Sequence, residues 1–243
     1  ERALEIVRQT TVTSATEWVS LSQSHNRILS EDLTSKVDDP PFDNSAMDGW
    51  AVRSTDQKRV EVGTTAAGTA PLKVEVGEAI RIMTGAPMPD GADAIVLIED
   101  GLQGKAHTHF IRRQGENLRK ETVALHTGQR MTPAAISMAA TMGHATIPVR
   151  AKPRVAVIST GDELIPPGEE LGVGAIYESN SYGLCALLEK IGCTPLLQET
   201  VVDSMDALRT TLDSLDCDVI LTSGGVSMGE FDHVRNLMEQ EGE

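Results

Sequence analysis

Apolar residues recur at helical spacing near the start of the chain, and the spacing then changes to that of strands. Residues 3–9 and 15–29 follow the period of an amphipathic helix. From Trp50 to about Glu99 apolar and polar positions alternate, and glycines interrupt the alternation. This pattern predicts a small domain of short strands and tight turns. A further helix is expected over 133–143, which has a proline at its start and a glycine at its end.

The second half of the chain alternates apolar strands with helices. Strands are expected at 155–159, 195–202 and 219–222, and helices at 180–190, 205–215 and 231–238. This alternation predicts right-handed crossovers and a parallel sheet covered on both faces. The expected fold class is α/β and multidomain, with a small mainly-β domain inserted in an α+β linker domain and followed by a doubly wound parallel sheet. Such a sheet ordinarily continues with more strands, so we expect the chain to be part of a longer protein.

The composition disfavours several classes of partner. The chain has 243 residues, of which 40% are hydrophobic, and a formal net charge of −15. This charge disfavours nucleic acid and anionic membranes, and no apolar run is long enough to span a bilayer. Cys185, Cys193 and Cys217 lack Cys-x-x-Cys spacing and lie among apolar residues. They therefore indicate buried free thiols of a reducing cytoplasm, and no zinc site.

Polar residues follow each of the three expected parallel strands. They are Thr160–Glu163 after the first strand, Asp203 after the second and Ser223–Asp232 after the third. In an open parallel sheet these loops share the carboxyl edge, where ligands bind. We therefore expect the chemistry at this edge.

Two kinds of group at this edge suit a phosphorylated ligand. Glu163, Asp203 and Asp232 could together bind a hard cation such as Mg²⁺ through oxygen, although each acid alone is more often a helix cap or turn residue. The loop after the third strand can line up its backbone amides toward an anion ahead of a helix. The members of this glycine loop singled out here are Ser223, Gly224, Gly225 and Ser227.

The run Pro-Pro-Phe-Asp-Asn-Ser-Ala-Met-Asp-Gly-Trp-Ala at 40–51 mixes turn formers with residues that favour burial. Gly49 after Asp48 allows a positive φ, so a sharp turn is expected there. An Asp-Gly turn between two strands is the simplest interpretation of the pair. Thr84 lies in the string Ile-Met-Thr-Gly-Ala-Pro-Met-Pro at 82–89, as a turn threonine at a strand end.

Together these strings resemble the molybdopterin molybdenumtransferase family, which includes MoeA and the gephyrin E domain. The run at 40–51 resembles its signature, and the stretches 159–164, 176–180 and 222–232 resemble its molybdopterin-binding domain, which has a MogA-like fold. The resemblance extends to the string at 82–89. By resemblance, the catalytic residues are Asp48, Glu163, Asp203 and Asp232, and the last three also bind metal. The residues that bind the pterin substrate are then Thr84, Thr160, Gly161, Ser223, Gly224, Gly225 and Ser227.

The resemblance implies an enzyme of molybdenum cofactor biosynthesis. Such an enzyme inserts molybdate into adenylylated molybdopterin, releases AMP and depends on a divalent cation, here Mg²⁺. It also implies a cytoplasmic homodimer that contacts other proteins of cofactor biosynthesis. The implied domains are 1–39 plus 111–150 for linker and dimerisation, 40–110 for the small β domain and 151–243 for the MogA-like domain.

Two features of the sequence complicate this interpretation. Anionic substrates require a cation or a basic patch on so acidic a chain, and the candidates Arg112, Arg113, Arg119 and Lys120 could equally form a solvated turn. After Lys120 the family continues with a Gly-Glu-Asp-Ile segment whose aspartate is functional. That segment is absent here, so a short loop is either deleted or left out of the given sequence.

Two other functions stay open at this stage. The gephyrin branch uses the same fold as a scaffold for a partner peptide, and an exposed apolar groove would favour that function. A nucleotide-cleaving pyrophosphatase of the CinA type also has a MogA-like domain, but the run at 40–51 lies outside that shared domain and counts against it. The sequence does not distinguish molybdenum from tungsten.

Overall fold

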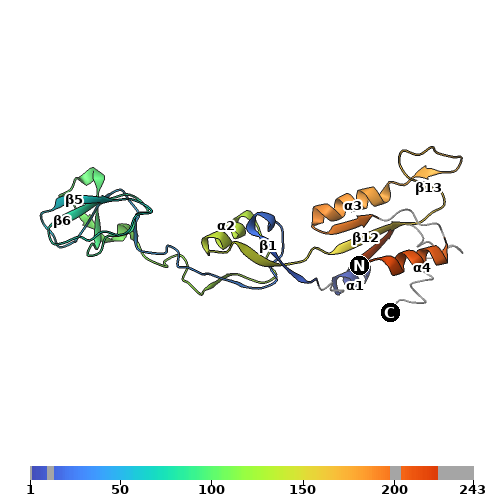
Figure 1. Cartoon of the computed structure of the whole chain (residues 1–243), viewed down its shortest axis with the longest axis horizontal. Helices are drawn as coiled ribbons and strands as arrows, with labels where there is room; N and C mark the ends of the chain where they lie inside the picture. The colour runs from blue at the N-terminus through green and yellow to red at the C-terminus, as the bar shows by residue number, and fades with distance from the viewer. Residues whose placement is uncertain (1, 10–13, 198–203, 224–243) are drawn as a thin grey trace. The chain divides into compact units, whose positions relative to one another are not determined.

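The computed structural model describes residues 2–9, 14–197 and 204–223 of the chain (Figure 1). The chain forms two compact units. One is Trp18–Pro148, and the other combines Glu1–Glu17 with Val149–Glu243. The division into three domains expected from the sequence stays a prediction.

A five-stranded sheet dominates the first unit. Its strand order is β5-β6-β4-β7-β8, so β4 is central, and all neighbours are antiparallel except β5 and β6. Trp50 and Val52 of β4 pack into a buried cluster with Val96, and Ala51 packs with Ile95 in a second cluster. The alternation along the sequence therefore predicted this sheet correctly. The strands are β4 (Gly49–Val52), β5 (Val60–Thr65), β6 (Glu78–Ile82), β7 (Ala94–Leu97) and β8 (Ala106–His107).

The expected helix at 133–143 is confirmed as α2 (Pro133–Thr141). The Thr132 side chain accepts a hydrogen bond from the backbone N–H of Ala135 at 3.3 Å, and Gly143 has a φ of 85° just beyond the end of the helix. These are the ordinary start and stop signals of a helix. The other elements of this unit are η1 (Leu21–Gln23), β2 (Leu33–Thr34), β3 (Asn44–Ser45), η2 (Ile98–Asp100), η3 (Thr108–Phe110), β9 (Ile111–Arg112) and β10 (Val123–Leu125).

The expected helix at 15–29 is wrong. Residues there form β1 (Thr16–Ser20), η1 and a turn in which Asn26 has a φ of 63°. β1 pairs with β11 (Thr146–Arg150), and the Leu29 N–H donates to the Gln129 carbonyl at 2.9 Å. Pairing with residues distant in sequence therefore overrides the helical spacing of the apolar residues.

The second unit contains the expected parallel sheet. β12 (Arg154–Ser159) lies between β15 (Thr194–Leu197) and β16 (Val219–Ser223) and is parallel to both. The helices α3 (Asn180–Ile191) and α4 (Met205–Ser214) connect these strands and lie on opposite sides of the sheet (Figure 1). The doubly wound fold class is therefore confirmed, whereas the helix expected at 231–238 lies outside the described residues. The unit also contains α1 (Arg2–Gln9), β13 (Leu164–Ile165) and β14 (Ile176–Tyr177).

The strand order determines where a ligand is expected to bind. β12 comes first along the chain, β15 pairs on one side of it and β16 on the other, so the order reverses between β12 and β16. In doubly wound folds the crevice beyond the carboxyl ends of the strands at this reversal is the usual ligand site. Ser159 and Ser223 are register partners at that edge.

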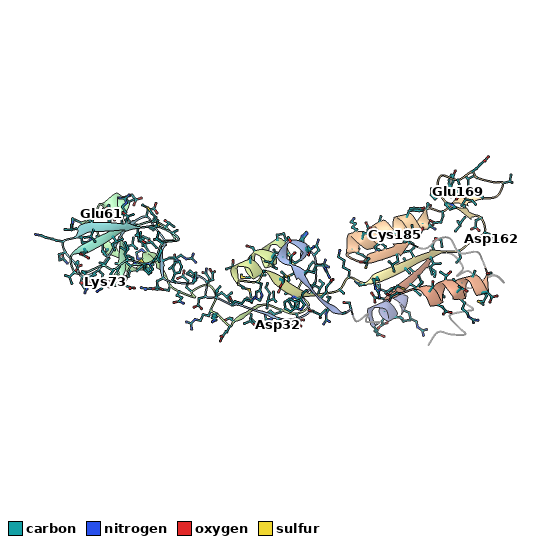
Figure 2. All side chains as sticks on the ribbon, viewed as in Figure 1. Asp32, Glu61, Lys73, Asp162, Glu169 and Cys185 are labelled. Carbon is teal, nitrogen blue, oxygen red and sulfur yellow. The ribbon has the colours of Figure 1, made fainter. Side chains whose placement is uncertain are left out.

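The three cysteines are half-buried rather than buried, and all are free thiols. Figure 2 labels Cys185 on α3. Burial raises the pKa of the Cys185 thiol, and the nearby charges of Glu189 and Glu178 raise it further. None of the helices in the described ranges is long and apolar enough to cross a membrane.

Candidate functional sites

Asp48 and Thr84, predicted separately from two strings, form a direct contact. The Asp48 carboxylate accepts hydrogen bonds from the Thr84 backbone N–H at 2.7 Å and from its hydroxyl at 2.9 Å. Both side chains are exposed. The backbone and hydroxyl donors of Thr84, followed by the charge of Arg81, lower the pKa of Asp48. The carboxylate is therefore ionised and accessible at neutral pH.

Gly49 has a different role from the one expected. It begins β4 and does not have a positive φ, so no sharp turn occurs there. A Cβ at this position would lie 2.0 Å from the Val96 carbonyl oxygen on the neighbouring strand β7. Glycine is needed because the two backbones approach so closely. Asp48 directly precedes Gly49, so it stands just before the first residue of the central strand β4.

Arg81 and Trp50 extend the surroundings of Asp48. They are register partners on β6 and β4, and the Arg81 guanidinium carbon lies 5.2 Å from the centre of the Trp50 ring. The Trp50 indole N–H donates to the Glu61 carboxylate at 2.7 Å, and Figure 2 labels Glu61 on β5. Arg81 therefore lies beside an aromatic ring, and its positive charge acts on Asp48.

The four basic residues considered for an anion-binding patch lie beside acids. Arg112 pairs with Glu116 at 2.9 Å, and Arg113 pairs with Asp43 at 2.6 Å. The pKa of Asp38 is lowered chiefly by a hydrogen bond from the Lys120 backbone N–H, and the positive charges of Arg119 and Lys120 lower it further. The solvated turn is the better interpretation of these residues. At this turn the Thr122 N–H donates to the Arg119 carbonyl at 3.2 Å.

The residues predicted after β12 lie at the carboxyl edge. Thr160 is buried, and its backbone N–H donates to the Ser223 carbonyl at 3.3 Å. Gly161 has a φ of 152°, and a Cβ on it would lie 2.7 and 2.8 Å from the two carboxylate oxygens of Glu163. Glu163 is exposed, and its carboxylate lies directly over the Gly161 backbone. Glycine therefore leaves the space that this carboxylate uses.

Ser223 ends β16, and its hydroxyl accepts a hydrogen bond from the Asn180 side-chain amide at 3.0 Å. It is the part of the predicted glycine loop that the structure describes. Within the described ranges, no group of three or more His, Cys, Asp or Glu residues is arranged to hold a metal ion. The remaining predicted residues of this edge lie outside the described ranges, and they are Asp203, Gly224, Gly225, Ser227 and Asp232.

Sequence reasoning assigned no role to Glu178, which is 4% exposed at the same edge. Its carboxylate accepts hydrogen bonds from the Ser159 hydroxyl at 3.1 Å, from the Ser181 backbone N–H at 2.9 Å and from the Ser181 hydroxyl. Burial would raise the pKa of Glu178, but these donors and the Asn180 backbone N–H lower it overall. Glu178 lies in the string 176–180 that resembles the family's molybdopterin-binding domain, but an acid just before a helix is by itself typical of an ordinary helix cap.

Two family models match this chain. The model of the MoeA N-terminal region (domain I and II) matches residues 1–143, and that of a probable molybdopterin binding domain matches residues 156–243. The chain belongs to the MoeA family. The match to the MoeA N-terminal region, which includes the run at 40–51, favours this family over a CinA-type pyrophosphatase.

Relatives support the same family. Molybdopterin molybdenumtransferase 2 of Mycobacterium tuberculosis H37Rv is 41% identical over 90% of this chain and 59% of its own length. The molybdopterin molybdenumtransferase of Haemophilus influenzae is 34% identical over 98% of this chain and 63% of its own. A crystal structure of the MoeA molybdopterin biosynthesis protein from Pyrococcus horikoshii OT3 aligns with this chain with a TM-score of 0.76 and 33% sequence identity. The alignment covers 88% of this chain and 63% of the Pyrococcus chain. The chain thus spans about three fifths of the length of these relatives.

Proposed function

We propose that the protein containing this chain is a molybdopterin molybdenumtransferase. Its substrates would be adenylylated molybdopterin and molybdate, and AMP would be released as the metal enters the pterin dithiolene. The observation that carries the proposal is the edge between β12 and β16, where Thr160 and Ser223 come together at the order reversal of a MoeA-family sheet. The names of the curated relatives support it.

The roles of the residues follow from their chemistry. Thr160, Gly161, Ser223, Gly224, Gly225 and Ser227 would bind the phosphate side of the pterin through backbone amides and hydroxyls. Asp48, Glu163, Asp203 and Asp232 would be the catalytic carboxylates. Asp48 is fixed by Thr84, so it can orient a water molecule or a substrate hydroxyl without first reorganising. Thr84 would also contact substrate through its exposed side chain.

Glu163, Asp203 and Asp232 would hold the Mg²⁺ ion. The Glu163 carboxylate suits this role, because it is exposed and the described residues offer it no hydrogen bond or ion pair. A bound Mg²⁺ would neutralise the charge that develops at the phosphate. Removal of divalent cations with EDTA should abolish AMP release, and added Mg²⁺ should restore it. Activity that survives EDTA would contradict this assignment.

We also propose a cytoplasmic homodimer that contacts other proteins of molybdenum cofactor assembly. The free thiols of the chain suit a reducing compartment. Light scattering of the protein at micromolar concentration should give the mass of two copies, and a monomer would contradict the dimer.

The test of the function is molybdate-dependent cofactor assembly by the complete protein that contains this chain. Adenylylated molybdopterin and molybdate should give active cofactor and one AMP per pterin, and tungstate in place of molybdate would show which metal is preferred. A protein that binds a partner peptide but releases no AMP would instead be a scaffold.

A further inference from the structure

Glu178 is buried in a way that an ordinary helix cap does not require. It precedes α3 by two residues, and Ser179, the cap residue of that helix, makes no side-chain cap hydrogen bond. The Glu178 carboxylate takes over this role, because it accepts from the backbone N–H of Ser181 at 2.9 Å. Glu178 is only 4% exposed, and burying a charged group costs free energy unless the group is hydrogen-bonded.

The carboxylate also bonds outside its own helix. It accepts a hydrogen bond from the hydroxyl of Ser159, the last residue of β12, at 3.1 Å. Ser159 is 2% exposed and stands directly before Thr160 and Gly161. Glu178 therefore ties the carboxyl end of β12 to the first turn of α3 at the point where the candidate site begins.

A second connection reaches the neighbouring strand. Asn180, also in the first turn of α3, donates its side-chain amide to the Ser223 hydroxyl at 3.0 Å. The Thr160 backbone N–H donates to the Ser223 carbonyl at 3.3 Å. The start of α3 thus links the ends of β12 and β16, and Glu178 is the charged group directly before this helix.

We propose that Glu178 is a positioning residue of the molybdopterin site: its buried carboxylate fixes the loop Thr160–Glu163 relative to Ser223. This inference rests on the proposed function. Glu178 touches no substrate and acts through Ser159. A buried carboxylate costs free energy unless it is fully hydrogen-bonded, so its donors hold the loop in one arrangement. A misplacement of about 1 Å in a preorganised site costs on the order of a hundredfold in rate.

The test compares Glu178→Gln with a matched control, Asp218→Asn. Asp218 also accepts from a backbone N–H of β12, that of Arg154 at 2.7 Å, but at the amino end of the strand. Hydrogen exchange of peptides covering 159–165 reports on the loop, and peptides covering 154–158 report on the strand. In Glu178→Gln the loop should exchange about tenfold faster while the strand stays protected, and Asp218→Asn should leave the loop unchanged.

Kinetics separate positioning from a merely structural role. For adenylylated molybdopterin, Glu178→Gln should lower kcat/KM about a hundredfold, and Asp218→Asn should lower it less than about threefold. Glu178→Asp, which keeps the charge, should recover part of the loss. A folded Glu178→Gln protein with normal loop exchange and normal kcat/KM would overturn the proposal.

A second variant covers the case in which Glu178→Gln does not fold. Ser159→Ala removes only the contact between Glu178 and β12, and it should produce faster loop exchange and a smaller loss of kcat/KM. Unchanged values in a folded Ser159→Ala protein would equally overturn the proposal. If the unaltered protein released no AMP, the proposed function would fail, but the exchange of the loop would still show whether Glu178 fixes it.

Discussion

The Asp48 carboxylate accepts two hydrogen bonds from a single residue, Thr84, at 2.7 Å from its backbone N–H and 2.9 Å from its hydroxyl. A similar pair occurs in this unit, where the Asp93 carboxylate accepts from the backbone N–H of Ser54 at 2.6 Å and from its hydroxyl at 2.8 Å. The Ser54 donors bond different oxygens of Asp93, whereas both Thr84 donors bond Oδ1 of Asp48. One pair lies in the strings that resemble the family signature, and the other does not. The two pairs therefore allow a controlled test of whether Asp48 is functional.

Asp48→Asn should abolish metal insertion and leave the fold intact. The amide keeps the size of the side chain but cannot hold a cation or accept a proton as well as a carboxylate does. Loss of one electrostatic group from a preorganised site costs roughly a hundredfold to a thousandfold in rate. The measurement is molybdenum-dependent cofactor assembly, together with the thermal unfolding temperature. Asp93→Asn is the control and should assemble cofactor normally, and normal assembly by Asp48→Asn would make Asp48 a turn residue.

Thr84→Val should shift the acidic limb of the pH–rate profile to higher pH. Hydrogen bonds from Thr84 lower the pKa of Asp48, so removing the hydroxyl raises that pKa and the carboxylate protonates earlier as the pH falls. Thr84→Ser keeps a hydroxyl and should retain the original profile. Identical acidic limbs for the two variants would show that the hydroxyl does not control Asp48.

Gly161→Ala should impair catalysis more than it impairs folding. The new Cβ would enter the space of the Glu163 carboxylate, which lies 2.7 Å away, and move it. Gly168→Ala is the control, because Gly168 also has a positive φ, 101°, but no heavy atom lies within 4 Å of its Cβ position. Both variants should lose more than about 1 kcal/mol of stability, because alanine does not readily adopt a positive φ. Only Gly161→Ala should need more Mg²⁺ for half-maximal AMP release, and an equal requirement in both variants would contradict the role of Glu163.

Glu178 should contribute to stability at neutral pH and lose this contribution in acid. Its pKa in the folded state is below the ordinary value of 4.5, so the native state binds the proton more weakly than the unfolded chain does. The contribution is complete above pH 4.5 and disappears as the pH falls through the lowered pKa. Denaturant unfolding between pH 7 and pH 3 should therefore show a steeper decline for the unaltered protein than for Glu178→Gln. Parallel declines would mean that other carboxylates control acid unfolding.

Local signals predicted the parts of the fold that depend on neighbouring residues. Pro133 and Gly143 bounded α2 correctly, and the helix expected at 180–190 is α3, which ends at Gly192 with a φ of 96°. The segment 15–29 was mispredicted because its partners, such as Gln129, are distant in sequence. No spacing rule reports such pairing.

In the candidate site, too, the sequence predicted what depends on neighbouring residues and missed what depends on distant contacts. The order of strands and polar loops was enough to place Thr160 and Ser223 at one edge. Glu178 was missed because its burial depends on a contact with Ser159, which follows only from the packing of α3 on the sheet. Gly49 was recognised as important for the wrong reason, since the Val96 carbonyl rather than its own φ requires it.

The close approach of Gly49 to Val96 has a consequence for selectivity. Asp48 stands directly before the central strand β4, which pairs with β6 on one side and β7 on the other, so β4 cannot leave the sheet without breaking pairing on both sides. Thr84 holds the side chain as well. If Asp48 binds a ligand as proposed, little conformational entropy would be lost on binding, but the rigid carboxylate would not adapt to a ligand of different shape. Such rigidity favours one ligand geometry over close analogues.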